Sequence, residues 1–235
     1  MTGLRDAIIV ALDTDMHEAL ALARSLEGRA RWVKVGMTLF YAEGPEAVSR
    51  FRDMGFEVFL DLKLHDIPHQ VEGAAREIAR LGASMFTVHA CGGGAMMEAA
   101  VRGACDGSAE CGADTPSVLA VTVLTSMDSA TLESVGVHAP LDSQVGLLGR
   151  LALRAGVQGV VCSPHEAAAM RELFGPERLV VTPGVRPQWA AAGDQARTAT
   201  PRQALEAGAS HLVIGRPITA ADRPATAFER IVEEG

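Results

Sequence analysis

EVFLDLKLHDIPHQ, residues 57–70, is the stretch in which the strand pattern and the chemistry of this chain meet. It opens with an apolar run of β-forming side chains, residues 58–60, which predicts a short buried strand of the parallel type. Residues two apart on a strand point to the same face, so Asp61 and Lys63 are expected to lie on one side of it, with His65 as a further candidate. A carboxylate and an ammonium group are thereby predicted at the end of a buried strand.

A helix is predicted directly after this strand. Asp66 is a typical N-cap residue, and Pro68 suits the first turn of a helix that we expect to run to about Leu81. The segment therefore places a second carboxylate where the strand gives way to the helix. His65 and His69 are four residues apart, a spacing that binds zinc when both side chains share one helix face. The helix start between them argues against a shared face, so no metal site is predicted.

Lysine is almost absent from this chain. Of the 21 lysine and arginine residues, 19 are arginine and only Lys34 and Lys63 are lysine. Both stand near the ends of predicted strands, in WVKVG and FLDLK. A lysine amine exchanges its proton when its surroundings tune it, whereas an arginine stays charged under almost all conditions. The two lysines are therefore candidates for chemistry.

The alternation of strand and helix extends along the whole chain. Besides the stretch quoted above, the strand-like runs are IIVALD (8–13), WVKVG (32–36), MFTVHA (85–90), SVLAVTVLTS (117–126), GVVCS (159–163), LVVTPG (179–184) and HLVIG (211–215). Eight such runs, each followed by a helix-like segment, predict a single (β/α)8 barrel domain over residues 1–235. Helices are expected, among other places, over residues 16–26, from about residue 45 to residue 54 and, after a polar connection, around residues 147–156. A doubly wound open sheet is the alternative, but it usually has fewer strands, and no GxGxxG turn follows the first one.

The composition limits the possible partners. The chain has 235 residues, 48% of them hydrophobic, which is ample for a large core, and its formal net charge is −8. This charge argues against nucleic acid or an anionic membrane as a partner, and cations that hold an anionic ligand must be concentrated in one place. The four cysteines show neither C-x-x-C nor zinc spacing, and no secretory segment or membrane span is recognised. We therefore expect a cytoplasmic protein with reduced thiols.

In a barrel of this type the functional site lies at the carboxyl ends of the strands. The polar residues at the first five of these ends are Asp13, Lys34, Asp61, Lys63, His89, Thr125 and Ser126, of which His89 is expected to act only as a hydrogen-bonding neighbour. The last two strands lead into PGVRP and IGRP, which place Gly184 with Arg186, and Gly215 with Arg216, where barrels commonly bind phosphate. The long connection from Gly184 to Pro201 is expected to form a lid or binding loop.

The motifs DLKLHDIP, VKVG, LTS, TPGVRP, GDQAR and IGRP, taken together and in this order, resemble those of the orotidine 5'-phosphate decarboxylase family. The resemblance spans nearly the whole chain, and the Asp-x-Lys-x-x-Asp-Ile-Pro pattern is specific to the family when joined to the other motifs. It implies a homodimeric barrel, with active sites shared across the interface, that converts the small-molecule nucleotide orotidine 5'-phosphate to UMP. It also implies that no metal and no organic cofactor takes part.

The resemblance further implies roles for single residues. Lys63 would protonate C6 within a charged array formed with Lys34, Asp61 and an Asp66 from the second subunit. The residues implied to bind substrate are Asp13, Lys34, Asp61, Ile67, Gln70, Thr125, Ser126, Arg186, Gln195, Gly215 and Arg216. Among them, Gln195 would bridge base and phosphate from the lid. The family usually has threonine where this chain has Gln70. The resemblance therefore does not decide whether Gln70 makes the ribose contact that the threonine makes across the dimer.

The charges of the motif suit a decarboxylation. Loss of CO2 leaves a carbanion, which the ammonium of Lys63 stabilises and then protonates, while flanking carboxylates favour the charged form of that amine. One alternative is a sugar-phosphate decarboxylase or synthase of the same barrel superfamily, which uses Mg2+. Lys34 stands where those enzymes carry a metal-binding acid, and a cation repels Mg2+. A second alternative is a non-catalytic nucleotide-binding barrel, which would not need Lys63 and its two acids.

Overall fold

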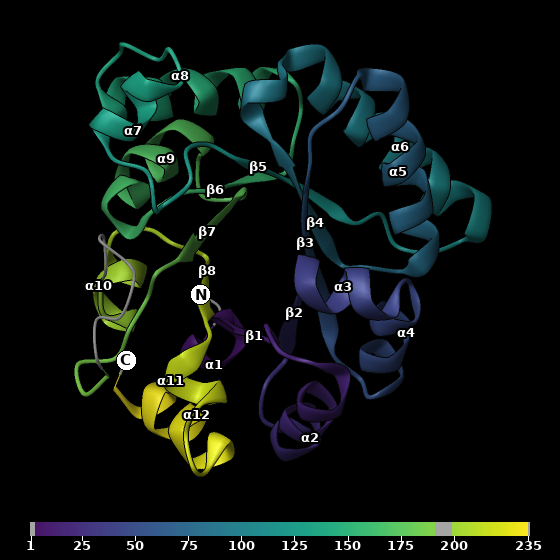
Figure 1. Ribbon diagram of the computed structural model, residues 1–235, viewed down its shortest axis with the longest axis vertical. Coiled ribbons are helices and arrows are strands. Elements are labelled where there is room, and N and C mark those ends of the chain that lie inside the picture. Colours follow the sequence, from purple (N-terminus) through teal and green to yellow (C-terminus); the bar gives the residue numbers. More distant parts are fainter. Residues whose placement is uncertain (1–2, 191–198, 235) are drawn as a thin grey trace.

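The computed structural model describes residues 3–190 and 199–234 of the chain. Its strands form a closed barrel in which sequence neighbours pair in parallel and β8 pairs with β1 (Figure 1). The strands are β1 Ile8–Ala11, β2 Trp32–Gly36, β3 Glu57–Leu64, β4 Met85–His89, β5 Ser117–Val121, β6 Gly159–Val161, β7 Leu179–Pro183 and β8 His211–Ile214. The predicted (β/α)8 architecture is confirmed.

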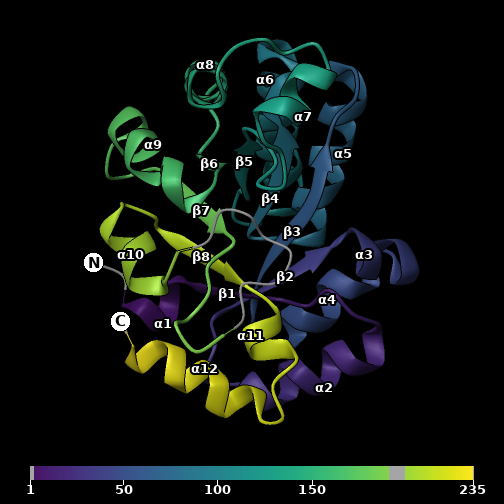
Figure 2. The same ribbon diagram turned by 60° about the vertical axis from the view of Figure 1, so that its left-hand side comes forward.

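Helices surround the barrel on its outer face. They are α1 Leu4–Ala7, α2 Met16–Leu26, α3 Met37–Glu43, α4 Glu46–Asp53, α5 Pro68–Leu81, α6 Gly94–Cys111, α7 Ser129–Ser134, α8 Leu141–Arg154, α9 Ala167–Phe174, α10 Pro201–Glu206, α11 Arg216–Thr219 and α12 Pro224–Glu233, with 3-10 turns at Ala90–Gly92 and Pro164–Glu166. The last helix packs against α11 and α2 and so closes the ring (Figures 1 and 2). Over the described ranges, no helix is both long and apolar enough to cross a membrane.

The strands are apolar along their length because both of their faces are buried. Ile8 and Val10 belong to the large cluster between the barrel and its helices, whereas Ile9 belongs to a smaller cluster that fills the barrel interior. The interior cluster consists of Ile9, Ala11, Trp32, Phe59, Met85, Leu119, Val181 and Val213. This alternation between two cores explains why the strands read as continuous apolar runs in the sequence.

Strand β3 bulges where its charged residues begin. Leu60 and Leu64 pair with Phe86 and Val88, so four steps along β3 lie opposite only two steps along β4. Within this bulge Lys63 has a φ of 53°, the one positive value among the described residues other than glycine. Side chains with a Cβ rarely adopt this left-handed region. The regular alternation that the sequence predicts for this strand is therefore interrupted.

The fifth strand is shorter than its sequence predicts. The run SVLAVTVLTS was expected to be extended as far as Ser126, but β5 ends at Val121. The chain then leaves the barrel and closes a turn in which the Met127 N–H donates to the Leu124 carbonyl oxygen at 2.9 Å. The β-branched and apolar character of the sequence continues past this point, so the pattern contains no signal for the end of the strand.

Short helices were also missed by the sequence pattern. The helix expected from residue 45 to residue 54 corresponds to α4, but α3 precedes it and has no counterpart in the prediction. Likewise, α7 was expected to be a polar connection, and α8 begins at Leu141, earlier than the helix expected around residues 147–156. Segments of two turns or fewer are too short to show a clear helical period.

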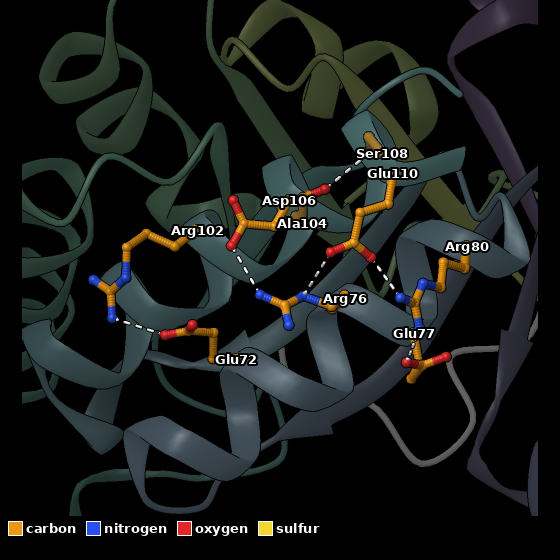
Figure 3. A network of polar contacts seen from close by, with 9 residues as sticks. All are labelled: Glu72, Arg76, Glu77, Arg80, Arg102, Ala104, Asp106, Ser108 and Glu110. Carbon is orange, nitrogen blue, oxygen red and sulfur yellow. Dashed lines mark hydrogen bonds and ion pairs between the residues drawn. The ribbon is translucent and has the colours of Figure 1, made fainter. Parts of the chain in front are cut away.

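Helices α5 and α6 pack side by side along their length (Figures 1 and 2). A Cβ atom on Gly103 would lie 2.1 Å from the carbonyl oxygen of Glu72, and one on Gly107 would lie 2.4 Å from that of Arg76. Four ion pairs join the exposed edges of the two helices: Arg76–Asp106, Arg76–Glu110, Arg80–Glu110 and Arg102–Glu72 (Figure 3). Exposed pairs of this kind contribute little stability, so the close glycine contacts hold α5 against α6.

The end of the barrel opposite to the carboxyl ends of the strands contains a buried histidine. His211 begins β8 and contacts Trp32 edge to face, with ring centroids 5.3 Å apart. Burial, and secondarily the charge of Arg31, lower the pKa of His211 to about 4. His211 therefore stays neutral in the folded protein at pH values where an unfolded histidine, with a pKa near about 6.5, takes up a proton.

This histidine gives stability a predictable pH dependence. Between about pH 6.5 and pH 4 the unfolded chain binds a proton at His211 that the folded chain does not, so acidification lowers the free energy of unfolding by up to about 3 kcal/mol. Denaturant titrations across this range measure the loss, and His211→Phe, which cannot titrate, is expected to remove that part of the slope. An unchanged slope in His211→Phe would contradict the assignment.

Candidate active site

A cavity of about 550 Å³ opens at the carboxyl ends of the strands. This volume lies within the range typical of small-molecule sites. Most of the residues singled out from the sequence line it together: Asp13, Lys34, Asp61, Lys63, Thr125, Gly184, Arg186, Gly215 and Arg216. Residues separated by up to about 200 positions in the chain thus meet in one place, because every strand of a parallel barrel ends at the same rim.

Four charged side chains of alternating sign form an array along the cavity wall. The Lys34 Nζ donates to Asp13 Oδ1 at 2.7 Å and lies 3.8 Å from Asp61 Oδ2. The Lys63 Nζ donates to Asp61 Oδ1 at 2.8 Å. Lys34 is buried, and Asp61 and Lys63 are largely buried, so solvent screens their charges less than at an open surface. The array therefore offers an oriented ammonium group beside a carboxylate.

Gly36 makes the contact between Asp13 and Lys34 possible. A Cβ at this position would lie 2.7 Å from Asp13 Oδ1 and 2.9 Å from Lys34 Nζ, so any side chain would displace the ion pair. Gly36 also lines the cavity, but it is not among the residues predicted from the sequence to form the site. The sequence signal that identifies Gly36 as a candidate is its place at the end of a predicted strand, two residues after Lys34.

Two arginines line the part of the cavity that is formed after β7 and β8. Gly184 and Arg186 follow β7, Gly215 and Arg216 follow β8, and all four line the cavity. Gly215 is the N-cap of α11, so the wall contains both backbone and guanidinium groups. In a chain with a formal net charge of −8, two guanidinium groups at one edge of a cavity create a local preference for an anion.

Several predicted site residues do not reach this cavity within the described chain. Asp66, Ile67 and Gln70 are exposed at the start of α5, Ser126 is exposed beyond β5, and the cavity wall includes none of these four. Gln195 lies outside the described residues.

The predicted N-cap at Asp66 is wrong. Ile67 occupies the N-cap position and Pro68 the first helical position, while the carboxylate of Asp66 accepts a hydrogen bond from the Ile67 N–H at 2.6 Å. Proline restricts the residue before it to extended conformations, which sets the helix boundary at Ile67. Within the described chain, the acid paired with Lys63 is Asp61 and not Asp66.

His89 lies next to the charged array. Burial, followed by the nearby charges of His65 and Lys63, lowers the pKa of His89. The rings of His65 and His89 have centroids 5.6 Å apart. Among the described residues, no group of three or more histidine, cysteine or acidic side chains is arranged to hold a metal ion.

A closed (β/α)8 barrel with paired ammonium and carboxylate groups in a cavity at the carboxyl ends of its strands defines a TIM-barrel enzyme of the acid–base type. Residues 6–231 match the family model described as Orotidine 5'-phosphate decarboxylase / HUMPS family. The chain belongs to this family.

Individual relatives resemble the chain over nearly its full length. It is 52% identical over 227 residues to the orotidine 5'-phosphate decarboxylase of Anaeromyxobacter sp. (strain K), and the match covers 96% of each chain. It is 49% identical over 229 residues to the protein of the same name from Parasynechococcus marenigrum (strain WH8102), which covers 97% of this chain and 93% of that one. The crystal structure of the orotidine 5'-phosphate decarboxylase from Lactobacillus acidophilus matches with a TM-score of 0.86 and 39% identity, covering 97% and 98%.

Proposed function

We propose that this protein decarboxylates orotidine 5'-phosphate to UMP, the last step of pyrimidine nucleotide synthesis, without a metal ion or an organic cofactor. The observation that carries the proposal is the array of Asp13, Lys34, Asp61 and Lys63, which lines a cavity that two arginines also line. The array suits the reacting end of a nucleotide, and the arginines suit its phosphate. Relatives of about 50% identity that bear this name support the same activity.

Lys63 is the proposed acid of the reaction. The bond between C6 and the carboxylate carbon breaks, CO2 leaves, and the electron pair stays at C6, where the ammonium of Lys63 stabilises the developing negative charge. A proton then moves from Nζ to C6, and the neutral amine regains a proton from water. Asp61, which accepts a 2.8 Å hydrogen bond from Nζ, orients the ammonium for this transfer.

Arg216 is the proposed principal anchor for the phosphate, and its loss is expected to affect both binding and turnover. Because phosphate binding can drive closure over the substrate, Arg216→Ala is expected to raise KM and also to lower kcat, with kcat/KM falling by about 10- to 100-fold. Steady-state kinetics measure both constants. Arg50→Ala, which removes an exposed arginine paired with Glu46 on α4, is the matched control and is expected to be nearly neutral. A change in KM alone would show that the phosphate only anchors the substrate.

The competing function is that of the sugar-phosphate enzymes of the same family, which carry a metal-binding acid near the end of the second strand. Lys34 argues against this function, because it occupies that position in β2, is 7% exposed and donates a hydrogen bond to Asp13. An ammonium there disfavours a divalent cation at the same site. A non-catalytic binding role does not account for a second ammonium, Lys63, held against Asp61 within the cavity.

We also propose that two copies of the chain, each a single barrel domain over residues 1–235, form a homodimer that shares its active sites. Ile67 is 63% exposed and Tyr41 is 75% exposed, and Met37, which lines the cavity, is 45% exposed. Large apolar side chains at the surface near a functional rim are typical of an interface. A second copy docked on this face would bring its Asp66 and Gln70 toward the cavity.

The substrate and the free cysteines support a cytoplasmic location.

The loss of orotidylate absorbance in the presence of EDTA tests the activity. Turnover that is unchanged by the chelator is expected. Turnover that requires added Mg2+, or activity only with a sugar phosphate, would favour the competing function, and binding of UMP without any turnover would favour a binding role.

A further inference from the structure

Thr87 hydrogen-bonds both to the backbone of Lys63 and to the carboxylate of Asp61. It lies on β4, is fully buried, and contacts the bulge of β3. Its Oγ1 accepts a hydrogen bond from the backbone N–H of Lys63 at 2.9 Å and donates one to Asp61 Oδ1, also at 2.9 Å. A hydroxyl group has one proton and two lone pairs, so both bonds form at the same time.

The bulge explains why a hydroxyl group is needed at this place. In a regular parallel ladder the N–H of a strand residue donates to a backbone carbonyl of its neighbour, but the register of β3 and β4 shifts between Leu60 and Leu64. Lys63 lies within the shift, with a φ of 53°. A buried N–H without an acceptor, combined with a left-handed backbone, is unfavourable. The Thr87 hydroxyl supplies the acceptor and so stabilises the unusual conformation of Lys63.

The same hydroxyl fixes the carboxylate that orients the ammonium. Asp61 Oδ1 receives bonds from Thr87 Oγ1 and Lys63 Nζ, while Oδ2 faces Lys34 at 3.8 Å. Thr87 thus holds Lys63 twice, at its backbone directly and at its side chain through Asp61. The cavity wall, as far as the chain is described, does not include Thr87.

We propose that Thr87 is a positioning residue for the proton transfer by Lys63, acting through Asp61 and through the backbone of the bulge. The inference rests on the proposed function of Lys63. Because Thr87 acts on the acid and lies away from the cavity, its hydroxyl is expected to influence kcat and to leave the binding of nucleotide nearly unchanged.

Thr87→Ser and Thr87→Ala form a matched pair for the kinetic test. Both remove the methyl group, but only Thr87→Ala removes the hydroxyl. We expect Thr87→Ala to lower kcat by about 10- to 100-fold, the range for a lost hydrogen bond to a charged group, with KM and the Kd of UMP almost unchanged. Thr87→Ser is expected to restore most of kcat. Equal losses in both variants, or a loss confined to KM, would overturn the proposal.

The scarcity of lysine allows a second test that needs no turnover. Labelling with 15N-lysine gives backbone amide signals from Lys34 and Lys63 alone. The Lys63 amide is expected to be protected from hydrogen exchange in the wild type and in Thr87→Ser, and to lose protection in Thr87→Ala, while the Lys34 amide serves as reference. If Thr87→Ala does not fold, Thr87→Val, which keeps the volume, replaces it with the same expectations.

The two tests separate this inference from the proposed function. Unchanged protection of Lys63 without the hydroxyl would overturn the role of Thr87, whatever the activity of the wild type. A wild type that does not turn over orotidylate would overturn the proposed function and, with it, the catalytic part of the role, even where the exchange pattern is the expected one.

Discussion

Replacing Lys63 with alanine is expected to abolish turnover while the fold and the affinity for UMP persist. The physical reason is that Lys63 is the proposed donor of the proton to C6, and the other lysine, Lys34, is held by Asp13 at 2.7 Å. The arginines that are proposed to bind phosphate follow β7 and β8 and remain in place. Steady-state turnover, circular dichroism and UMP titration measure the three quantities.

Lys63→Arg is the informative companion. It keeps a positive charge next to Asp61, but a guanidinium is a poor proton donor. We expect it to fail nearly as completely as Lys63→Ala, which separates proton donation from mere charge stabilisation. More than a few per cent of the wild-type rate in either variant, a loss of only about 2 kcal/mol in transition-state stabilisation, would show that Lys63 is not the acid.

The second large effect concerns Asp66 and the proposed dimer. Asp66 is exposed and is not paired with Lys63 of its own chain within the described residues. If it completes the array of the second subunit, homodimers of Lys63→Ala and of Asp66→Asn are each nearly inactive. In a heterodimer of the two variants, both lesions fall in one site and the other site is intact, as the symmetry of a two-fold interface requires.

Co-expression with two different affinity tags isolates this heterodimer. Its activity is expected to approach half that of the wild type, whereas each parent homodimer stays near zero. Homodimers purified in parallel and mixed without subunit exchange are the control. A heterodimer as inactive as its parents would place Asp66 in the site of its own chain and would contradict the shared-site model.

The sequence was sufficient for the barrel and for most of the cavity. Strands buried on both faces leave continuous apolar runs, so β2 and α2 have the predicted bounds, at Trp32–Gly36 and Met16–Leu26. Charged residues at the ends of such runs then converge because all strands of a parallel barrel end at one rim. Lys34 and Lys63 were found from their rarity and from this position.

The features that escaped prediction depend on contacts between distant segments. The bulge of β3 arises from its pairing with β4, and Thr87, which supports it, is 24 residues from Lys63. Gly36 matters only because Asp13 and Lys34 meet beside it. Asp61 and Lys63 do meet as predicted, but through a bulge and not through regular alternation along the strand.

The central claim is that Lys63 protonates a carbanion at C6 of the nucleotide after CO2 leaves. The hydrogen isotope that C6 of the product carries is the most direct test of this claim. Wild-type protein is incubated with orotidine 5'-phosphate in D2O with EDTA, and the product is identified by proton NMR. We expect UMP with deuterium at C6 and one CO2 released for each substrate molecule consumed. Unreacted orotidine 5'-phosphate, or a product formed only when Mg2+ is restored, would contradict the claim.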